Sequence, residues 1–317
     1  MALVLAALAA VEDACSDKHA ACGAWAASGE CAANANFMLV ECQQSCDACG
    51  RTPCSPFETS VDGASSADYL ATFERAASLA AYSPVVLSET PWVVRLDTFL
   101  TPAEAATVAE VGGHAFERST EGNGGAKAVS AARTSSSSWC NVPTCEEHPM
   151  IRTVKARILD VLRMPEENCE HLQVLRYEVG QFYRVHHDQS SPSRALEGPR
   201  VYTFYLYLSD VAAGGGTRFP ELNITVQPRA GRAVLWPSVL HADMHSPDWR
   251  TRHESLPVED GVKYGANFWV HLRNFQGPFR LACTGVHASH RAVAAGTSGS
   301  GRGDARTGDP SARKDEL

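Results

Sequence analysis

The spacing of apolar residues changes near residue 172, and this change constrains the fold more than any other feature. Upstream, Ile151, Val154, Ile158 and Leu162 recur at three- and four-residue intervals, which marks one face of a helix. Downstream the interval becomes two, which is typical of strands. The predicted strands are Leu172–Tyr177, Val201–Leu208, Ile224–Val226, Ala233–Trp236 and Tyr264–His271. Helices followed by many short strands predict a mainly β fold with flanking helices (α+β). Its expected form is a double-stranded β-helix, or jelly roll, with helices on one side.

Two elements precede these strands. Residues 92–96 form a predicted strand. Thr101 and Glu104 make a capping box for a helix that begins at Pro102 and ends near Val111. A chain of 317 residues with 44% hydrophobic content can bury one domain of about 150–250 residues plus small appendages. We therefore predict one large domain over residues 84–276.

Six of the eleven cysteines crowd into residues 15–49 with the spacing Cys-x6-Cys-x8-Cys-x10-Cys-x3-Cys-x2-Cys. This density is typical of a small module held by disulfides in an oxidising compartment, and six cysteines allow 15 pairings. A zinc site is disfavoured because the two-pair spacing of a four-cysteine zinc site is absent. The spacing resembles the ShK toxin-like (ShKT) module. That resemblance implies the pairs Cys15–Cys49, Cys22–Cys42 and Cys31–Cys46.

The two ends of the chain indicate the secretory pathway. Residues 2–10 resemble the apolar core of a signal peptide, and we assign residues 1–10 to a signal-peptide remnant. Residues 314–317 spell KDEL, the address that returns soluble proteins to the endoplasmic reticulum. We expect a lumenal protein with the KDEL receptor as a partner. No stretch approaches the roughly 20 apolar residues of a membrane span. A net charge of −8 disfavours nucleic acid as a partner.

Two segments are rich in small and polar residues. We predict a linker over residues 50–83, although residues 69–73 are apolar enough for a short helix, and a flexible tail over residues 277–317. Cys140 and Cys145 are close enough in sequence to close a small loop, and the sequence does not pair Cys54, Cys169 and Cys283. Asn223 opens a glycosylation sequon with Ile224 and Thr225, which burial in a strand would block.

A metal-binding pattern lies at residues 186–188. His186 and Asp188 are two apart, so both side chains point to the same side of an extended segment, an offset that His187 lacks. With one distant histidine, such a pair forms the facial triad of non-haem Fe(II) oxygenases, which leaves three positions open on the metal. Two positions suit a bidentate 2-oxo acid and the third suits O2. His253, 67 residues beyond His186, is the predicted third ligand.

Lys263, ten residues beyond His253, extends this pattern. A dicarboxylate such as 2-oxoglutarate brings a second carboxylate, whose burial is unfavourable unless a cation meets it. Lys263 is the predicted cation. Even spacing in a regular strand turns Lys263, Trp269 and His271 to one face.

A second set of evenly spaced residues lies upstream. Thr203, Tyr205 and Tyr207 share a face of their strand by the same rule. Tyr207 is the member placed to give its hydroxyl to the same carboxylate, and the alternative for these tyrosines is an ordinary role as core aromatics.

From about Trp92 to Asn274 the chain resembles the prolyl 4-hydroxylase family of the collagen and plant or algal cell-wall type. The matching blocks are residues 133–135, 173–188, 200–220 and 253–271. The resemblance implies an Fe(II) site of His186, Asp188 and His253, with Lys263 on the far carboxylate of 2-oxoglutarate. It further implies a cosubstrate pocket lined by Tyr177, Thr217 and Trp269, and a peptide face made by Tyr183, Arg200, His271 and Arg133.

The implied activity is hydroxylation of peptidyl proline, with 4-hydroxylation favoured. It is coupled to conversion of 2-oxoglutarate and O2 to succinate and CO2, with ascorbate as a further cofactor. Two alternatives stay open. A lysyl hydroxylase shares the triad and the compartment but typically pairs 2-oxoglutarate with arginine, so Lys263 favours proline. The other alternative is a non-catalytic binding protein of the endoplasmic reticulum whose ShKT module recruits a partner.

Overall fold

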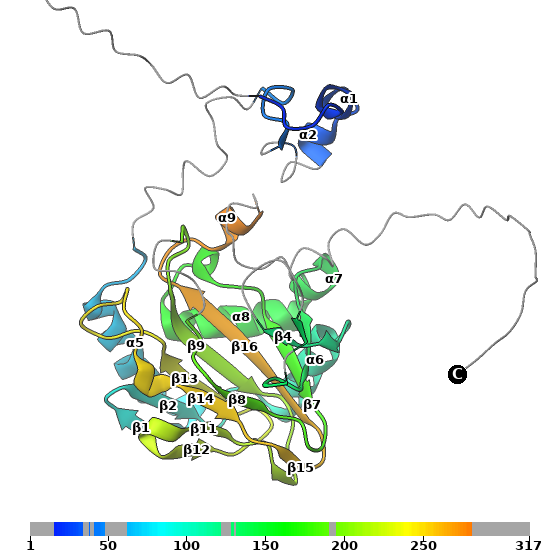
Figure 1. The fold of residues 1–317 in the computed structure, drawn as a ribbon. Helices are drawn as coiled ribbons and strands as arrows, with labels where there is room; N and C mark the ends of the chain where they lie inside the picture. The colour runs from blue at the N-terminus through cyan, green and yellow to red at the C-terminus, as the bar shows by residue number, and fades with distance from the viewer. Residues whose placement is uncertain are drawn as a thin grey trace, which may run out of the picture.

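The computed structural model describes residues 16–33, 38, 41–47, 62–121, 128–129, 131–189 and 195–280 (Figure 1). Most of them form one antiparallel β structure with helices along one side. The helices are α1 (Cys22–Ala27), α2 (Glu30–Ala33), α5 (Ser66–Ser78), α6 (Pro102–Gly112), α7 (Pro143–Glu146), α8 (Pro149–Leu162) and α9 (Gln276–Arg280). Short 3-10 turns include η2 (Glu166–Asn168), η3 (Pro220–Leu222) and η4 (Trp249–Thr251).

The larger sheet has eight strands in the order β1-β2-β13-β9-β16-β7-β6-β3. Their bounds are β1 (Pro84–Glu89), β2 (Trp92–Leu96), β3 (Glu117–Arg118), β6 (Ser136–Trp139), β7 (Gln173–Tyr177), β9 (Arg200–Tyr207), β13 (Ala233–Pro237) and β16 (Lys263–His271). Neighbouring strands are antiparallel throughout. All six strands predicted from the spacing of apolar residues are present in the structure, five of them in this sheet.

A smaller sheet has the order β12-β11-β14-β8. Its strands are β8 (Tyr183–His186), β11 (Thr217–Phe219), β12 (Ile224–Val226) and β14 (His253–Ser255). Two-stranded ladders join β10 (Ala213–Gly214) to β15 (Val258–Asp260) and β4 (Thr120–Glu121) to β5 (Ala128–Val129). Phe219 and Val226 of the smaller sheet share one buried cluster with Tyr207 and Trp236 of the larger sheet, so the two sheets pack face to face. This arrangement confirms the predicted jelly roll.

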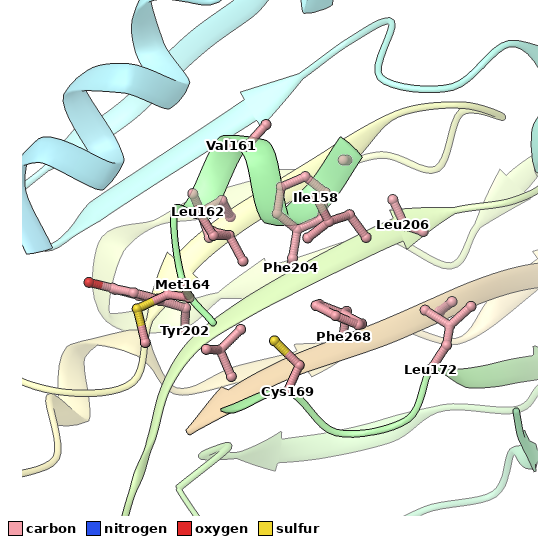
Figure 2. Close-up of a cluster of buried hydrophobic side chains, with 14 of the residues drawn as sticks. Ile158, Val161, Leu162, Met164, Cys169, Leu172, Tyr202, Phe204, Leu206 and Phe268 are labelled. Atoms are coloured by element: carbon pink, nitrogen blue, oxygen red, sulfur yellow. The ribbon is translucent and has the colours of Figure 1, made fainter. Parts of the chain in front are cut away.

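The outer face of the larger sheet is covered by helices (Figure 1). α8 begins at Pro149, after His148 caps the Met150 N–H, and its Ile158, Val161 and Leu162 join one buried apolar cluster with the sheet. Figure 2 shows Ile158 and Leu162 on the side of the helix that faces Phe204 of β9, with Phe268 of β16 in the same cluster. The predicted capping box of Thr101 and Glu104 starts α6. Burial of these apolar side chains therefore stabilises the packing of the helices on the larger sheet.

The predicted linker over residues 50–83 is wrong for its second half. α5 begins with a capping box of Ser65 and Asp68, and its Tyr69 and Phe73 are buried in the same apolar cluster as α8. Phe73 stacks on Trp92 with 5.9 Å between ring centroids. Alanine and serine are common both in linkers and in small amphipathic helices, so composition misled the prediction. The domain thus begins before residue 84, and α9 carries it past the predicted end at residue 276.

The cysteine-rich segment has two of its three predicted disulfides. Cys22 is bonded to Cys42 and Cys31 to Cys46, around a small core that includes Met38. The predicted Cys15–Cys49 pair lies outside the described residues.

Two further cysteine predictions fall within the large domain. Cys140 and Cys145 form the expected short disulfide loop, and Cys169 is a buried free thiol. Cys54, Cys283, the first ten residues and the KDEL sequence lie outside the described residues. None of the described helices combines the length and the apolar character that crossing a membrane requires.

Candidate active site

Three side chains converge where β8 and β14 meet. His186 ends β8, Asp188 follows two residues later, and His253 opens β14 directly opposite His186. Their ligand atoms all lie within 4.8 Å of one another. Asp188 Oδ2 is 3.5 Å from His253 Nε2, and Oδ1 is 3.8 Å from His186 Nε2. The structure therefore gathers the three predicted ligands, although they come from distant parts of the sequence.

Hydrogen bonds orient both imidazoles for metal binding. His186 Nδ1 donates to the Arg184 carbonyl at 2.9 Å, and His253 Nδ1 donates to the Thr251 carbonyl at 3.0 Å. A carbonyl only accepts, so each Nδ1 carries the proton and each Nε2 keeps its lone pair for a metal. Two imidazoles and one carboxylate form the donor set that suits Fe(II). The residues present therefore fit the metal that the sequence predicts.

Electrostatics keep Asp188 and His186 in their metal-binding protonation states. Burial alone would raise the pKa of Asp188, but His253, His186 and the Thr203 hydroxyl outweigh it and hold that pKa at about 2. Thr203 Oγ1 donates to Asp188 Oδ2 at 2.7 Å. Burial, assisted by repulsion from His253, lowers the pKa of His186 to about 3. Carboxylate and neutral imidazole are the forms that bind a divalent cation.

Three other histidines, His187, His241 and His245, point away from the candidate metal site. The His187 ring packs against Trp249, and its Nε2 bonds the Asp248 carbonyl at 3.0 Å. His245 Nε2 pairs with Asp62, and His241 Nε2 bonds the Ser66 carbonyl. In all three imidazoles Nε2 is thus engaged away from the cluster of His186, Asp188 and His253.

Lys263 is fully buried without a carboxylate partner among the described residues. Its ammonium donates to Ser255 Oγ at 2.8 Å and lies 5.1 Å from the centre of the Tyr177 ring. Burial lowers the pKa of Lys263 to about 7. A buried ammonium that lacks a counter-charge is unfavourable, and an incoming carboxylate relieves the penalty. The lysine shares one pocket with His186 and His253, so a dicarboxylate can reach both ends.

The predicted cosubstrate residues divide into two groups. Tyr177 and Thr217 line the pocket beside Lys263. Tyr207 lies close behind, with its hydroxyl within hydrogen-bonding distance of Thr217 Oγ1 at 2.8 Å and of the Val226 carbonyl at 3.2 Å. Trp269 lies outside the pocket lining, under the Arg200 guanidinium, whose central carbon is 3.9 Å from the ring centroid. The Tyr207 hydroxyl therefore already bonds the smaller sheet, across from its own strand β9.

The residues predicted to contact the peptide lie in two separate places. Tyr183 stacks on His186 with 3.6 Å between ring centroids, and the Arg133 guanidinium covers Tyr183 at 4.8 Å. Arg200 and His271 instead lie buried around Glu170. Arg200 Nη2 bonds Glu170 at 3.1 Å, and His271 Nε2 lies 2.8 Å from the same carboxylate. Arg200 also donates to the Asp188 backbone carbonyl at 3.0 Å, which links this cluster to the candidate metal site.

Sequence reasoning missed several residues that support the site. Glu170 precedes β7 in a segment with no clear spacing pattern, so nothing local marks it as the partner of Arg200. Ser255 was detectable, because it lies two residues beyond His253 and therefore shares its strand face. Gly265 was not. A β-carbon there would lie 2.1 Å from the Tyr205 hydroxyl, so glycine alone leaves room for that ring beside Lys263.

Comparison with known proteins agrees with this geometry. Residues 172–271 match the 2OG-Fe(II) oxygenase superfamily, and residues 14–49 match the ShK domain-like family. Prolyl 4-hydroxylase subunit alpha-1 of Gallus gallus is 33% identical over 202 residues, which cover 61% of this chain and 38% of that protein. Probable prolyl 4-hydroxylase 6 of Arabidopsis thaliana is 32% identical over 226 residues, which cover 64% of this chain and 76% of that protein.

Among solved structures, a viral collagen prolyl hydroxylase from Paramecium Bursaria Chlorella virus-1 has 24% identity and a TM-score of 0.44. The match covers 56% of this chain and 95% of that one. Fold and metal ligands together define the class, a non-haem Fe(II) oxygenase with a 2-oxoglutarate site. The chain belongs to the prolyl 4-hydroxylase family of the 2OG-Fe(II) oxygenase superfamily. It spans only 38% of the length of the chicken alpha-1 subunit.

Proposed function

We propose that this protein hydroxylates peptidyl proline at carbon 4, with 2-oxoglutarate and O2 as cosubstrates. One observation carries the proposal: a buried lysine without a carboxylate partner shares a pocket with two imidazoles of a three-ligand site. Membership of the prolyl 4-hydroxylase family supports proline as the target. The lysyl hydroxylase alternative is less well supported, because the pocket offers Lys263 where arginine is the typical partner of 2-oxoglutarate.

His186, Asp188 and His253 would hold the iron. When bound, Fe(II) supplies the oxidative chemistry that converts 2-oxoglutarate and O2 to succinate and CO2 while one oxygen atom passes to proline. Lys263 binds the far carboxylate, and Tyr177 and Thr217 bound that end of the pocket. The protein's own contribution is to orient the cosubstrate and to exclude water from the reacting end.

Tyr183 and Arg133 are the proposed peptide contacts at the metal. Their stacked arrangement places an aromatic face against His186, the ligand nearest solvent. We propose that Arg200 and His271 border the peptide from deeper in the fold. Glu170 pairs with both, and Arg200 in turn covers the Trp269 ring and donates to the Asp188 backbone carbonyl.

We place this activity in the lumen of the endoplasmic reticulum. The Cys22–Cys42, Cys31–Cys46 and Cys140–Cys145 disulfides support an oxidising compartment. The KDEL sequence at residues 314–317 supports retention through the KDEL receptor. Nascent secreted chains are then the available substrates, with ascorbate as the reductant that keeps the iron in its active state.

The test offers proline-rich and lysine-containing collagen-like peptides side by side, with succinate release and a mass gain of one oxygen as readouts. We expect oxygen on proline and peptide-dependent succinate. Anaerobic Fe(II) plus 2-oxoglutarate should also give a weak visible absorption band that His186→Ala removes. Oxygen on lysine alone would establish the lysyl hydroxylase instead. If the wild-type protein gives neither the band nor succinate, the proposed activity is wrong and a binding role through the ShKT module replaces it.

A further inference from the structure

Trp236 is a buried donor without an acceptor in the cosubstrate pocket. Its side chain is 1% exposed and lines the pocket together with Lys263 and His253. Its indole N–H has no hydrogen-bond partner among the described residues. Buried donors are nearly always paired in folded proteins, so an unpaired one inside a pocket marks a place where a ligand atom accepts. Indole can only donate, which restricts the acceptor to an oxygen or another lone-pair atom.

The register of the larger sheet places Trp236 at the level of the metal ligands. Trp236 of β13 lies opposite Thr203 of β9, and Trp269 of β16 lies opposite the same threonine. Thr203 bonds Asp188, so the row Trp236–Thr203–Trp269 runs beside the candidate iron site. Lys263 begins β16, six residues before Trp269, and therefore lies toward the other end of the pocket.

Packing fixes the orientation of the indole. Its ring meets His253 edge-on with 4.8 Å between centroids and Phe219 at 5.2 Å. Trp269 also has an unpaired N–H but lies under Arg200 and outside the pocket lining. Trp236 is thus the indole of the row that borders both the pocket and a metal ligand.

We propose that the Trp236 N–H donates a hydrogen bond to an oxygen of the bound 2-oxo acid at its metal-proximal end. The inference rests on the proposed function and adds a second anchor opposite Lys263. Carboxylate oxygens at this end carry charge, and hydrogen bonds to charged acceptors are about twice as strong as neutral ones. Lys263 and Trp236 would then bind the two ends of the cosubstrate and select for a 2-oxo acid of matching length.

The test measures 2-oxoglutarate affinity by calorimetry on the full chain loaded with Zn(II), which requires no turnover. Trp236→Phe removes the donor and should weaken 2-oxoglutarate binding about tenfold or more. Zn(II) affinity measured without 2-oxoglutarate reports separately any effect of the lost ring packing on His253. Replacement of Trp236 by benzothienylalanine keeps the ring shape and removes only the N–H, so it should show the same loss if Trp236→Phe fails to fold. Trp92→Phe is the matched control, because Trp92 packs on α5 away from the pocket.

The outcomes separate this inference from the proposed function. Wild-type affinity in the benzothienylalanine protein, together with lost affinity in Lys263→Ala, would overturn the role of Trp236 and leave the 2-oxoglutarate site intact. Absence of 2-oxoglutarate binding in the wild-type protein would overturn both.

A second, independent observation concerns the turn between β11 and β12. Asn223 ends η3 with a left-handed φ of 54°, and both Asn223 and Thr225 are exposed. Thr225 lies on β12, the edge strand of the smaller sheet. Burial therefore does not block this sequon. Asn223 is thus an exposed residue of a tight turn, where the bulk of an attached group can extend into solvent.

We infer that Asn223 carries an N-linked glycan. This inference rests on the lumenal placement proposed above. The Asn223 amide nitrogen would bond to C1 of an oligosaccharide, losing one proton, while the lipid-linked pyrophosphate leaves as the donor's other product. A glycan here would also shield the exposed edge of β12, which is otherwise open to strand pairing with another chain.

The test expresses the full chain in a eukaryotic secretory host and maps the Asn223 peptide by mass spectrometry before and after glycosidase treatment. We expect the glycan in the wild-type protein and in Thr225→Ser, and its loss in Asn223→Gln and Thr225→Ala. Protease protection in isolated microsomes reports lumenal entry separately. A protected chain that lacks the glycan would overturn this inference alone, whereas an unprotected chain would overturn the placement on which it rests.

Discussion

The larger sheet has two buried faces with opposite chemistry. On β9, Phe204 points to the helices and joins an apolar cluster with Ile158 of α8 (Figure 2). The next residue along the strand, Tyr205, points to the pocket that holds Lys263. Phe204 and Lys263 are both 0% exposed, so the faces differ in what they bury and not in how much.

The two faces of the larger sheet serve stability and function separately. Burying apolar groups on the helix side stabilises the folded state. Burying the Lys263 ammonium on the other side opposes folding until a ligand compensates its charge. A single strand serves both purposes because successive residues point to opposite faces. Substitutions on the two faces should therefore have effects of different kinds.

The largest effect is expected from Asp188→Ala on the site face. Removing the carboxylate leaves two of the three proposed ligands, and we expect turnover to fall at least about 1000-fold. The melting temperature should fall only modestly, because the substitution removes the acceptor of the Thr203 hydroxyl and a carboxylate that the fold stabilises, but leaves the apolar core unchanged. Peptide-dependent succinate release and thermal unfolding measure the two quantities. Asp160→Ala, on the exposed face of α8, is the control and should change neither.

Ile158→Ala should have the opposite profile. Its side chain is fully buried against the sheet, and we expect the free energy of unfolding to fall by about 2–5 kcal/mol, with Ile158→Val losing about 0.5–1.5 kcal/mol. Denaturant titration measures both. Affinity for 2-oxoglutarate should stay at the wild-type value at temperatures where the variant is folded. A parallel loss of affinity would show that the two faces are coupled.

The pH dependence of 2-oxoglutarate binding follows from the lowered pKa of Lys263, about 7 in the ligand-free protein. Above pH 7 the lysine loses the charge that the cosubstrate needs, so affinity should fall by about tenfold per pH unit. Stability without ligand should move the other way. The unfolded chain keeps this proton up to about pH 10.4, so it binds more protons and the free energy of unfolding rises above pH 7.

Lys263→Arg tests that assignment, because arginine keeps its charge across this range. Calorimetry between pH 6 and 8.5 should give a flat profile for the variant and a falling one for the wild type. Equal slopes in both proteins would assign the titration to another group.

The smallest effect is expected from Thr203→Val. The Thr203 hydroxyl holds Asp188 Oδ2, and losing such a support typically weakens metal binding by about tenfold. Thr72→Val is the matched control on the helix side, where a buried hydroxyl donates to the Leu162 carbonyl. Both variants should lose similar stability, but only Thr203→Val should weaken Fe(II) binding. Metal titration of the two variants checks this difference.

Local patterns in the sequence predicted much of the fold. Alternation identified β7, β9, β13 and β16, and the capping box at Thr101 placed α6 to within a residue. The apolar run at residues 69–73 indicated a short helix, but the small residues around it resemble a linker, so the full length of α5 was not predicted. Its burial depends on a sheet that lies far away in the sequence. Short strands such as β8 and β14 are too brief for periodicity to reveal, yet they carry His186 and His253.

The sequence by itself determined which residue types are available for the site. The two-residue offset between His186 and Asp188 and the even spacing of Lys263 and Trp269 follow from strand geometry alone. Beyond Trp269 the register shifts before His271, which no local rule anticipates. The tertiary structure alone decided that β14 places His253 opposite His186, that Glu170 pairs with Arg200, and that Lys263 is buried without a counter-charge. These contacts join residues tens of positions apart, so they depend on strand order and packing, which spacing along the chain does not encode.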